Sequence, residues 1–370
     1  MIPPFARILS NVPAMTPFVG PEALERRRGR PFRLRLGANE SAFGVSPRAK
    51  AAMAAELDGV SWYCDPEHFD LRGRLASPLG LARENIVIGE GVDGLLGVIV
   101  RAFVDPGEAV VTSAGAYPTF NYHVIGYGGR LVFVPYTPDC RNDLEALVET
   151  ARREDAKLLY LANPDNPTGS FLPGDAVEQA LARLPEGCLL VLDEAYAEFA
   201  PPGQLPSMAP DDPRVIRLRT FSKAHGMAGL RIGYGIAAPE VVAAFDKIRL
   251  HFGVGRLSQV AALASLDDPD FAAGVVREVA EGRRDYEALG RALQLGTLPS
   301  LTNFVAFDLE SAAASDRMVA LLDERDVFVR KPGVAPLDRF VRVTVGTAGE
   351  RAGFAEAFGD AVKALRAART

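Results

Sequence analysis

Hydrophobic residues occur in short continuous runs that alternate with stretches of helical periodicity. Seven runs rich in Val, Ile and Leu predict strands at residues 84–91, 108–115, 129–136, 156–164, 188–196, 214–222 and 230–238. Helices are expected at 93–103, 143–154, 174–184 and 239–250. Most of the strand runs are apolar throughout, which is typical of strands covered on both faces. The pattern therefore predicts an α/β fold with a mainly parallel central sheet and helices on both faces.

The pattern changes near residue 267, where the sequence DDPD precedes a long charged helical stretch at 271–293. Short apolar runs and helices then alternate up to a last helix that ends near Arg366. This order predicts a large domain at residues 36–268 and a smaller α+β domain at residues 269–370. Residues 1–35 have no strand partner nearby in the sequence, so we expect them to form an N-terminal arm that packs on the small domain.

Composition excludes several classes of protein. The chain has 370 residues, of which 48% are hydrophobic and 24% charged, which suits a globular protein of more than one domain. Its net charge of -6 does not indicate a nucleic-acid surface. No apolar run approaches the roughly 18 residues of a membrane span, and the first 20 residues lack a signal-peptide core. We therefore expect a cytoplasmic protein with neither a nucleic-acid nor a membrane partner.

The three cysteines are too few and too scattered to predict a disulfide framework or a zinc site; they are Cys64, Cys140 and Cys188. No metal is expected. No repeat of 20 to 50 residues is present, which disfavours solenoids and propellers.

Four short polar stretches follow predicted strands: GEGVDG at 89–94, NPDNPTG at 163–169, DEAY at 193–196 and TFSK at 220–223. Each has a structural alternative, since Asp193 could start a loop, Asn166 lies among turn residues and Lys223 could extend its amine to water. Ligands of open parallel sheets bind outside the carboxyl ends of the strands. The four stretches are therefore predicted to converge on one crevice.

Together with other motifs, these stretches resemble the fold type I enzymes that depend on pyridoxal phosphate, and most closely the histidinol-phosphate aminotransferase family. The resemblance spans about Gly37 to Gly346 and rests on GANESAFGVSP, SWYCDPEHFDLRGRLA, GEGVDG, AYPTF, NPDNPTG, DEAY, SKAHGMAGLRIGYG, FVRKPG and RVTVGT. Each motif is weak alone, but the combination is specific. It implies a homodimeric transaminase that moves an amino group between an amino acid or amino-alcohol phosphate and a 2-oxo acid, with histidinol phosphate and 2-oxoglutarate as the first expectation.

The resemblance assigns roles around the cofactor ring. Lys223 matches the lysine that binds pyridoxal phosphate covalently and later moves a proton, and Asp193 matches the carboxylate beside the ring nitrogen. Asn166 and Tyr196 match donors to the phenolic oxygen. Tyr117 matches the aromatic residue that stacks on the ring.

It also implies contacts to anions. The cofactor phosphate is expected at Ser222, Arg231 and the backbone N–H groups of Val92, Asp93 and Gly94. Tyr63 matches a tyrosine that reaches this phosphate from the neighbouring subunit. For the substrate, Arg342 matches the arginine that binds the donor carboxylate, Arg330 resembles a second arginine near the anionic end, and Asn39 lies in a substrate-contacting loop.

Two departures from the family leave the substrate open. Gly94 stands where relatives more often have an acid, and the sequence HFGVGRLSQ begins at His251 where many relatives have Pro-Tyr-Asn. His251 and Arg256 are thus expected as unusual residues of a substrate-proximal loop. An aromatic or broad-range amino acid aminotransferase remains the main alternative, followed by a decarboxylase of a phosphorylated amino acid. A pyridoxal-binding regulator is disfavoured because no DNA-binding segment is recognisable.

Overall fold

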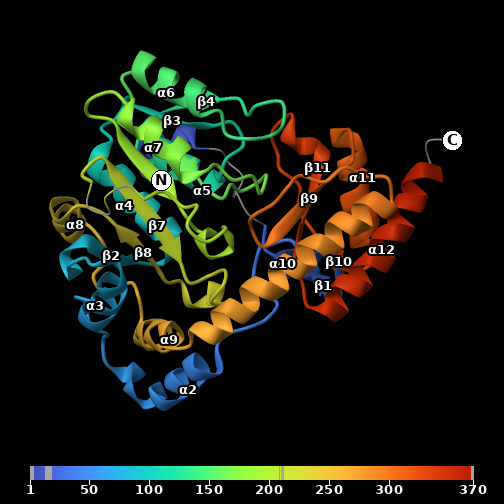
Figure 1. Cartoon of the computed structure of the whole chain (residues 1–370), viewed down its shortest axis with the longest axis horizontal. Helices are drawn as coiled ribbons and strands as arrows, with labels where there is room; N and C mark the ends of the chain where they lie inside the picture. The colour runs from blue at the N-terminus through green and yellow to red at the C-terminus, as the bar shows by residue number, and fades with distance from the viewer. Residues whose placement is uncertain (1–3, 13–18, 208, 210–211, 368–370) are drawn as a thin grey trace.

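The computed structural model describes residues 4–12, 19–207, 209 and 212–367. Its larger unit is built on a seven-stranded sheet of order β2-β8-β7-β6-β5-β3-β4 (Figure 1). These strands are β2 (Ile86–Gly89), β3 (Ala109–Ser113), β4 (Arg130–Val134), β5 (Leu158–Ala162), β6 (Leu189–Asp193), β7 (Val215–Thr220) and β8 (Gly233–Ile236). All run parallel except β8, which is antiparallel to both of its neighbours. The predicted mainly parallel sheet is confirmed.

Helices cover both faces of this sheet because alternate strand residues are apolar on each face. Tyr160 and Val191 pack with one set of helices, α4 (Gly91–Phe103), α5 (Pro118–Gly126) and α8 (Pro239–Asp246). Leu161 and Leu192 pack with another set, α6 (Leu144–Arg153) and α7 (Gly174–Ala182). At the end of the sheet formed by β2 and β8, the apolar core includes α2 (Pro47–Ala55), α3 (Phe69–Ala76) and α9 (Arg256–Leu266).

The C-terminal unit begins with the long helix α10 (Pro269–Ala292), which runs diagonally from near α9 to the side of α12 in Figure 1. Its strands β9 (Phe304–Asp308) and β11 (Phe340–Thr344) pair antiparallel. The remaining elements are α11 (Ala312–Asp323), β10 (Val327–Phe328) and α12 (Ala348–Ala367). Aromatic side chains fill its core, with Phe307 contacting both Phe354 and Phe358. The expected smaller α+β unit is thus present.

The N-terminal residues contact both units. Strand β1 (Leu34–Arg35) pairs with β10, and helix α1 (Pro21–Arg28) is tied to the C-terminal unit by Arg28, which donates to Asp326 at 2.5 Å. By contrast, the short helix η1 (Arg7–Asn11) lies against α5 of the larger unit. The expectation that all of residues 1–35 pack on the small domain is therefore wrong for 7–11. Residues 1–3 and 13–18 of the expected arm lie outside the described residues.

Candidate active site

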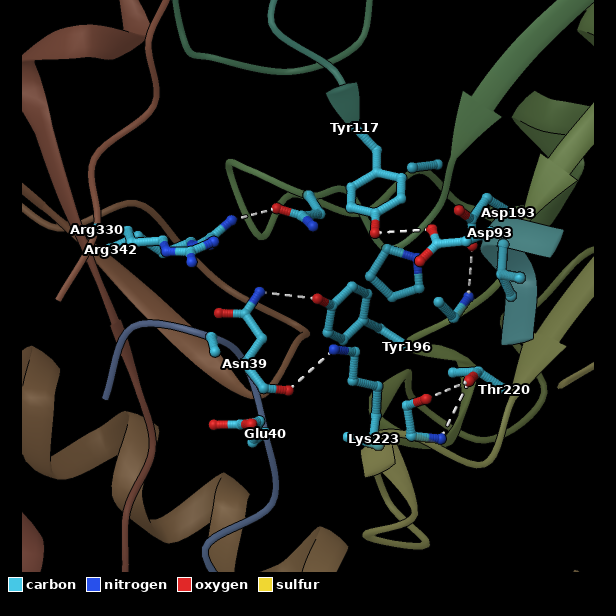
Figure 2. A pocket seen from close by; sticks show the side chains of 18 of the residues that line it. Asn39, Glu40, Asp93, Tyr117, Asp193, Tyr196, Thr220, Lys223, Arg330 and Arg342 are labelled. Carbon is cyan, nitrogen blue, oxygen red and sulfur yellow. Dashed lines mark hydrogen bonds between the residues drawn. The ribbon is translucent and has the colours of Figure 1, made fainter. Parts of the chain in front are cut away.

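A pocket opens where the carboxyl ends of β5, β6 and β7 face the C-terminal unit (Figure 2). Twelve of the fourteen residues predicted for the site line it: Asn39, Val92, Asp93, Tyr117, Asn166, Asp193, Tyr196, Ser222, Lys223, Arg231, Arg330 and Arg342. They come from segments that are far apart in the sequence and meet because parallel strands present their carboxyl ends at one edge. The predicted convergence is confirmed.

Lys223 and Asp193 open onto this one pocket. The Lys223 amine donates to the Asn39 carbonyl at 3.0 Å. Burial, helped by the positive charge of Arg342, lowers the pKa of Lys223 to about 8. The Asp193 carboxylate accepts from the Tyr160 hydroxyl at 2.7 Å and from the Ala195 N–H at 2.9 Å. Burial nevertheless raises the pKa of Asp193 to about 6. The pocket thus pairs an amine that loses its proton readily with a carboxyl group that is held away from water.

Hydrogen bonds also fix the polar groups between these two residues. The Asn39 side-chain amide donates to the Tyr196 hydroxyl at 2.8 Å, and Arg342 donates to the Asn166 side-chain oxygen at 2.5 Å. Burial raises the pKa of Tyr196 to about 12, although Arg342 opposes that shift. Arg342 Nε is buried and has no hydrogen-bond partner among the described residues. An arginine donor left over in a pocket favours an anionic ligand.

A guanidinium lies close to the backbone at the start of α4. Gly91 has a φ of 73°, and a Cβ built there would lie 2.6 Å from Arg231 Nη2. The backbone can therefore approach the guanidinium only because residue 91 is glycine. Arg231 also lies 3.3 Å from the Asp93 carboxylate, which accepts from the Tyr117 hydroxyl at 2.9 Å. A guanidinium beside the first turn of a 13-residue helix is suited to a phosphate monoester.

Two predicted residues do not line the pocket. Gly94 lies on α4 beyond it, and a Cβ at that position would lie 2.7 Å from Glu90 Oε2, so the Glu90 side chain occupies the space that an acid at 94 would need. Tyr63 is 81% exposed and packs on Phe252, with ring centroids 4.7 Å apart. Gly94 does not line the pocket, and the expected contact of its N–H with a phosphate stays a prediction; Tyr63 does not reach the pocket of its own chain.

The HFGVGR loop was expected close to the substrate, but it lies elsewhere in the single chain. His251 Nε2 is 2.9 Å from the Asp246 carbonyl, and Arg256 donates to Glu56 at 3.0 Å and to the Tyr63 carbonyl at 2.8 Å. Neither residue lines the pocket. The Arg256 contacts hold the loop against residues 56–63, and a side chain at Gly253 would overlap Glu90. The placement of His251 and Arg256 beside the substrate is therefore wrong for this chain's own pocket.

Sequence reasoning missed eight lining residues: Ala38, Glu40, Tyr160, Ala162, Pro164, Ala195, Thr220 and Ala228. Tyr160 lies inside a strand and gave no local signal for a contact with Asp193. Glu40 and Thr220 belong to the quoted motifs GANES and TFSK, so their places in those motifs were a usable signal.

The part of the chain that the structure describes has neither a metal-binding cluster nor a helix that could cross a membrane. No group of three or more His, Cys, Asp or Glu side chains is arranged to hold a metal ion there. Nor does any described helix combine the length and apolarity that crossing a membrane requires.

Comparisons with known proteins agree with this geometry. The family model for aminotransferase class I and II matches residues 33–358. Histidinol-phosphate aminotransferase 2 of Carboxydothermus hydrogenoformans is 35% identical over 94% of this chain and 96% of its own. The corresponding enzyme of Roseiflexus castenholzii is 39% identical over 90% and 91%.

A solved structure is similar over almost the whole length. It is the histidinol-phosphate aminotransferase of Sinorhizobium meliloti in complex with pyridoxal-5'-phosphate, with 47% identity, a TM-score of 0.94 and 99% of each chain covered. The family model, the relatives and this structure point to the same group of enzymes. The chain therefore belongs to the class I and II aminotransferases, and within them to the histidinol-phosphate aminotransferase family.

Proposed function

We propose that this protein is a pyridoxal-phosphate-dependent aminotransferase that transfers the amino group of histidinol phosphate to 2-oxoglutarate in the cytoplasm. The observation that carries the proposal is the meeting of Lys223 and Asp193 in one pocket beside a phosphate cradle. The names of the relatives support the donor, and the bound cofactor of the Sinorhizobium meliloti structure supports the cofactor.

The residues present fit pyridoxal phosphate. Arg231, Ser222 and the first turn of α4 would hold its phosphate, Asp193 would lie beside the ring nitrogen and Tyr117 would cover one face of the ring. When bound, the cofactor supplies an electron sink for negative charge at the substrate α-carbon. A carboxylate at the ring nitrogen favours the protonated nitrogen that this chemistry needs.

Lys223 is suited both to bind the cofactor covalently and to move protons. Because burial lowers the pKa of Lys223 to about 8, a useful fraction of the amine is neutral near neutral pH. As a free amine, Lys223 would act as the base that takes the proton from the substrate α-carbon. The Asn39 carbonyl holds the amine on the side of the pocket that faces Tyr196, whose ring centroid lies 5.6 Å away.

Anion recognition would come from Arg342 and Arg330. Both line the pocket, and Arg342 has a buried donor without a partner among the described residues. A ping-pong reaction presents two different anions in turn, a phosphate monoester and a dicarboxylate. Two guanidinium groups can bind either one.

An aromatic or broad-range aminotransferase remains the second candidate because of an adjoining hollow. This hollow shares Tyr117 and the two arginines with the pocket, and its apolar walls include Val319, Phe328 and Val334. Such walls would accept a carbocyclic ring as well as an imidazole.

We further propose a homodimer in which Tyr63 reaches the cofactor phosphate of the partner subunit. The support is a cluster of exposed apolar side chains on this part of the chain: Val60 55%, Trp62 72%, Tyr63 81%, Leu250 70% and Phe252 50%. Clustered exposed side chains of this size are typical of an interface. Sedimentation of the purified protein tests the assembly, and a monomer at micromolar concentration would refute it.

The function is tested by mixing the cofactor-loaded protein with histidinol phosphate, phenylalanine and glutamate separately and following the cofactor spectrum. We expect histidinol phosphate and glutamate to convert the cofactor to its amine form, and 2-oxoglutarate to reverse that change. Fast conversion by phenylalanine alone would favour the aromatic alternative. Release of carbon dioxide would indicate a decarboxylase instead.

A further inference from the structure

Three carboxylates line the pocket, and one of them differs from the other two. Asp93 is bound by Tyr117 and Arg231, and Asp193 is bound by Tyr160 and the Ala195 N–H. The Glu40 carboxylate makes no hydrogen bond or ion pair with any residue that the structure describes. It is exposed and available to a ligand.

The backbone at Glu40 is held firmly even though its carboxylate is not. Asn39 has a φ of 55°, and its N–H donates to Thr344 Oγ1 at 3.0 Å. Asn303 donates to the carbonyls of both Asn39 and Glu40, at 3.0 and 3.2 Å. Figure 2 places Glu40 next to Asn39, on the side of the pocket away from Tyr117 and Asp193. The backbone that carries the Glu40 side chain is therefore fixed at the edge of the pocket, and its carboxylate is left to meet a ligand.

Glu40 is also close enough to two cations of the pocket to act on them. Burial lowers the pKa of both Lys223 and Arg330, and the Glu40 charge opposes that shift in each case. A carboxylate at this place repels any substrate anion that approaches Arg330, a phosphate as well as a second carboxylate. It attracts an N–H group, above all one on a ring that carries positive charge.

We propose that Glu40 is a specificity-determining residue whose carboxylate accepts a hydrogen bond from a ring N–H of the amino donor. The pocket then favours a donor with a nitrogen heterocycle over one with a carbocyclic ring. This inference rests on the proposed function and deepens it by assigning the group that distinguishes an imidazole from a phenyl ring.

The test compares three amino donors: histidinol phosphate, phenylalaninol phosphate, which has the same phosphate but no ring nitrogen, and glutamate. Glu40→Ala should lower kcat/KM for histidinol phosphate about tenfold, the lower end of what loss of a hydrogen bond to a charged group costs, mainly through KM. Phenylalaninol phosphate and glutamate have no ring N–H to lose a partner, so kcat/KM for these two donors should not fall and should rise where the repulsion from Glu40 is relieved.

Two further variants separate charge from hydrogen bonding. Glu40→Gln keeps an acceptor oxygen, so it should lose less with histidinol phosphate than Glu40→Ala while it gains as much with glutamate. Glu149→Gln, on the exposed face of α6 and outside the pocket, is the matched control and should change none of the three donors. The cofactor absorbance of each variant monitors folding.

The outcomes distinguish this inference from the function beneath it. Equal changes with all three donors, or no change, would overturn the role of Glu40 while leaving the transaminase intact. If the wild-type protein fails to convert its cofactor with histidinol phosphate but does so with other amines, the proposed donor is wrong and the role of Glu40 falls with it.

Discussion

The two walls of the pocket are built differently. On one wall, Asp193 ends strand β6 and Lys223 follows strand β7 of a sheet whose central strands are buried almost throughout. On the other wall, Arg342 lies on β11 of a two-stranded sheet and is bridged to Arg330 across an isolated β-bridge. The first wall has the rigidity that covalent chemistry needs. The second belongs to the C-terminal unit, whose core also includes Tyr196 and Ala224 of the larger unit, so the two walls are packed against each other.

Asn39 lies at the seam between these walls. Its side chain binds Tyr196 of the larger unit, and its N–H binds Thr344 of the smaller one. Substitutions on the sheet wall should therefore change the binding and chemistry of the cofactor, whereas substitutions on the opposite wall should change the use of substrate. Each of the following variants tests whether cofactor chemistry and substrate recognition are separated in this way.

The largest effect is expected from Lys223→Ala. Loss of the amine removes both the covalent attachment and the proton transfer, so turnover and the absorbance band of the lysine-bound cofactor should disappear. Spectra and steady-state rates measure both. The control is Lys157→Ala, which should retain full activity. Lys157 precedes β5, at the end of the strand away from the pocket, and lies 3.4 Å from Glu108. Retained turnover in a clean Lys223→Ala preparation would remove the central assignment.

Asp193→Asn should have the next largest effect. The amide is nearly the same size, but it carries no charge to favour a proton on the ring nitrogen, so kcat should fall on the order of a hundredfold or more. Rapid-mixing measurement of each half-reaction locates the loss in the proton-transfer step. A fall in cofactor content without a fall in the rate per bound cofactor would show that Asp193 only holds the ring.

Arg342→Ala tests the opposite wall. Removing this guanidinium should raise the KM of the donor roughly tenfold to a hundredfold, because a charged hydrogen bond to the substrate anion is lost. Cofactor retention during dialysis should stay close to that of the wild type. If the variant loses cofactor more than it raises the donor KM, the second wall also binds the cofactor and the division between the two walls is wrong.

The pH dependence of cofactor attachment is expected to follow Lys223. Since burial and Arg342 lower the pKa of Lys223 to about 8, the amine is protonated below that pH and neutral above it. The rate at which cofactor-free protein binds pyridoxal phosphate covalently should rise with pH up to about 8 and then level off. Arg342→Ala removes a positive neighbour and should move this inflection to higher pH.

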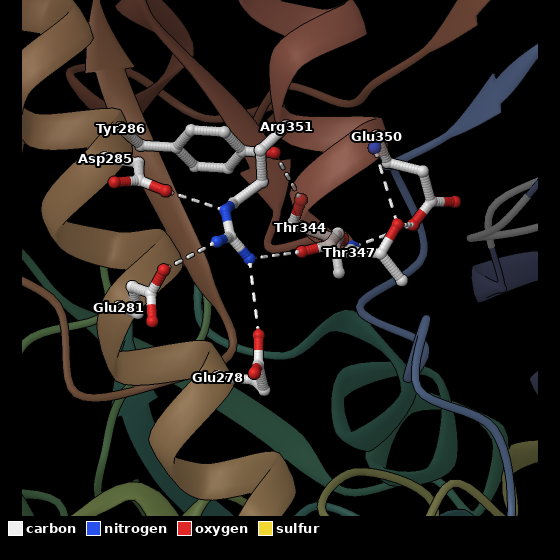
Figure 3. A network of polar contacts seen from close by, with 9 residues as sticks. Glu278, Glu281, Asp285, Tyr286, Thr344, Thr347, Glu350 and Arg351 are labelled. Carbon is white, nitrogen blue, oxygen red and sulfur yellow. Dashed lines mark hydrogen bonds and ion pairs between the residues drawn. The ribbon is translucent and has the colours of Figure 1, made fainter.

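Arg351→Met is expected to have the smallest effect on turnover. Arg351 stabilises the C-terminal unit, which carries the second wall of the pocket. Arg351 is 5% exposed and joins α12 to α10 through Glu278, Glu281 and Asp285 (Figure 3). It also donates to the Gly346 carbonyl, just beyond β11. Since the acids are half exposed, we expect the free energy of unfolding to fall by only about 1–3 kcal/mol.

Denaturant titration of cofactor-free protein measures this loss of stability. The control is Lys363→Met, because Lys363 is exposed on the same helix, pairs with Asp360 at 3.0 Å and should contribute less than about 1 kcal/mol. Equal destabilisation by the two variants would show that the buried network is not a special support for β11.

The chain's apolar runs and its polar motifs were sufficient to locate the sheet and most of the pocket. Strand formation depends on local runs of residues, and the edge at which Asp193, Lys223 and Asn166 meet follows from the parallel order of strands. The short helix at residues 7–11 was placed wrongly because its packing on α5 depends on contacts with a distant segment.

Positions that depend on pairs of distant side chains could be found only in the folded molecule. Gly94 and Gly253 both make room for Glu90, and the free carboxylate of Glu40 is recognisable only when the partners of Asp93 and Asp193 are known. Periodicity and motif order report which element a residue belongs to, because these depend on near neighbours in sequence. The direction of a side chain and the residues it contacts are set by packing between elements. A local sequence pattern carries no information about that packing.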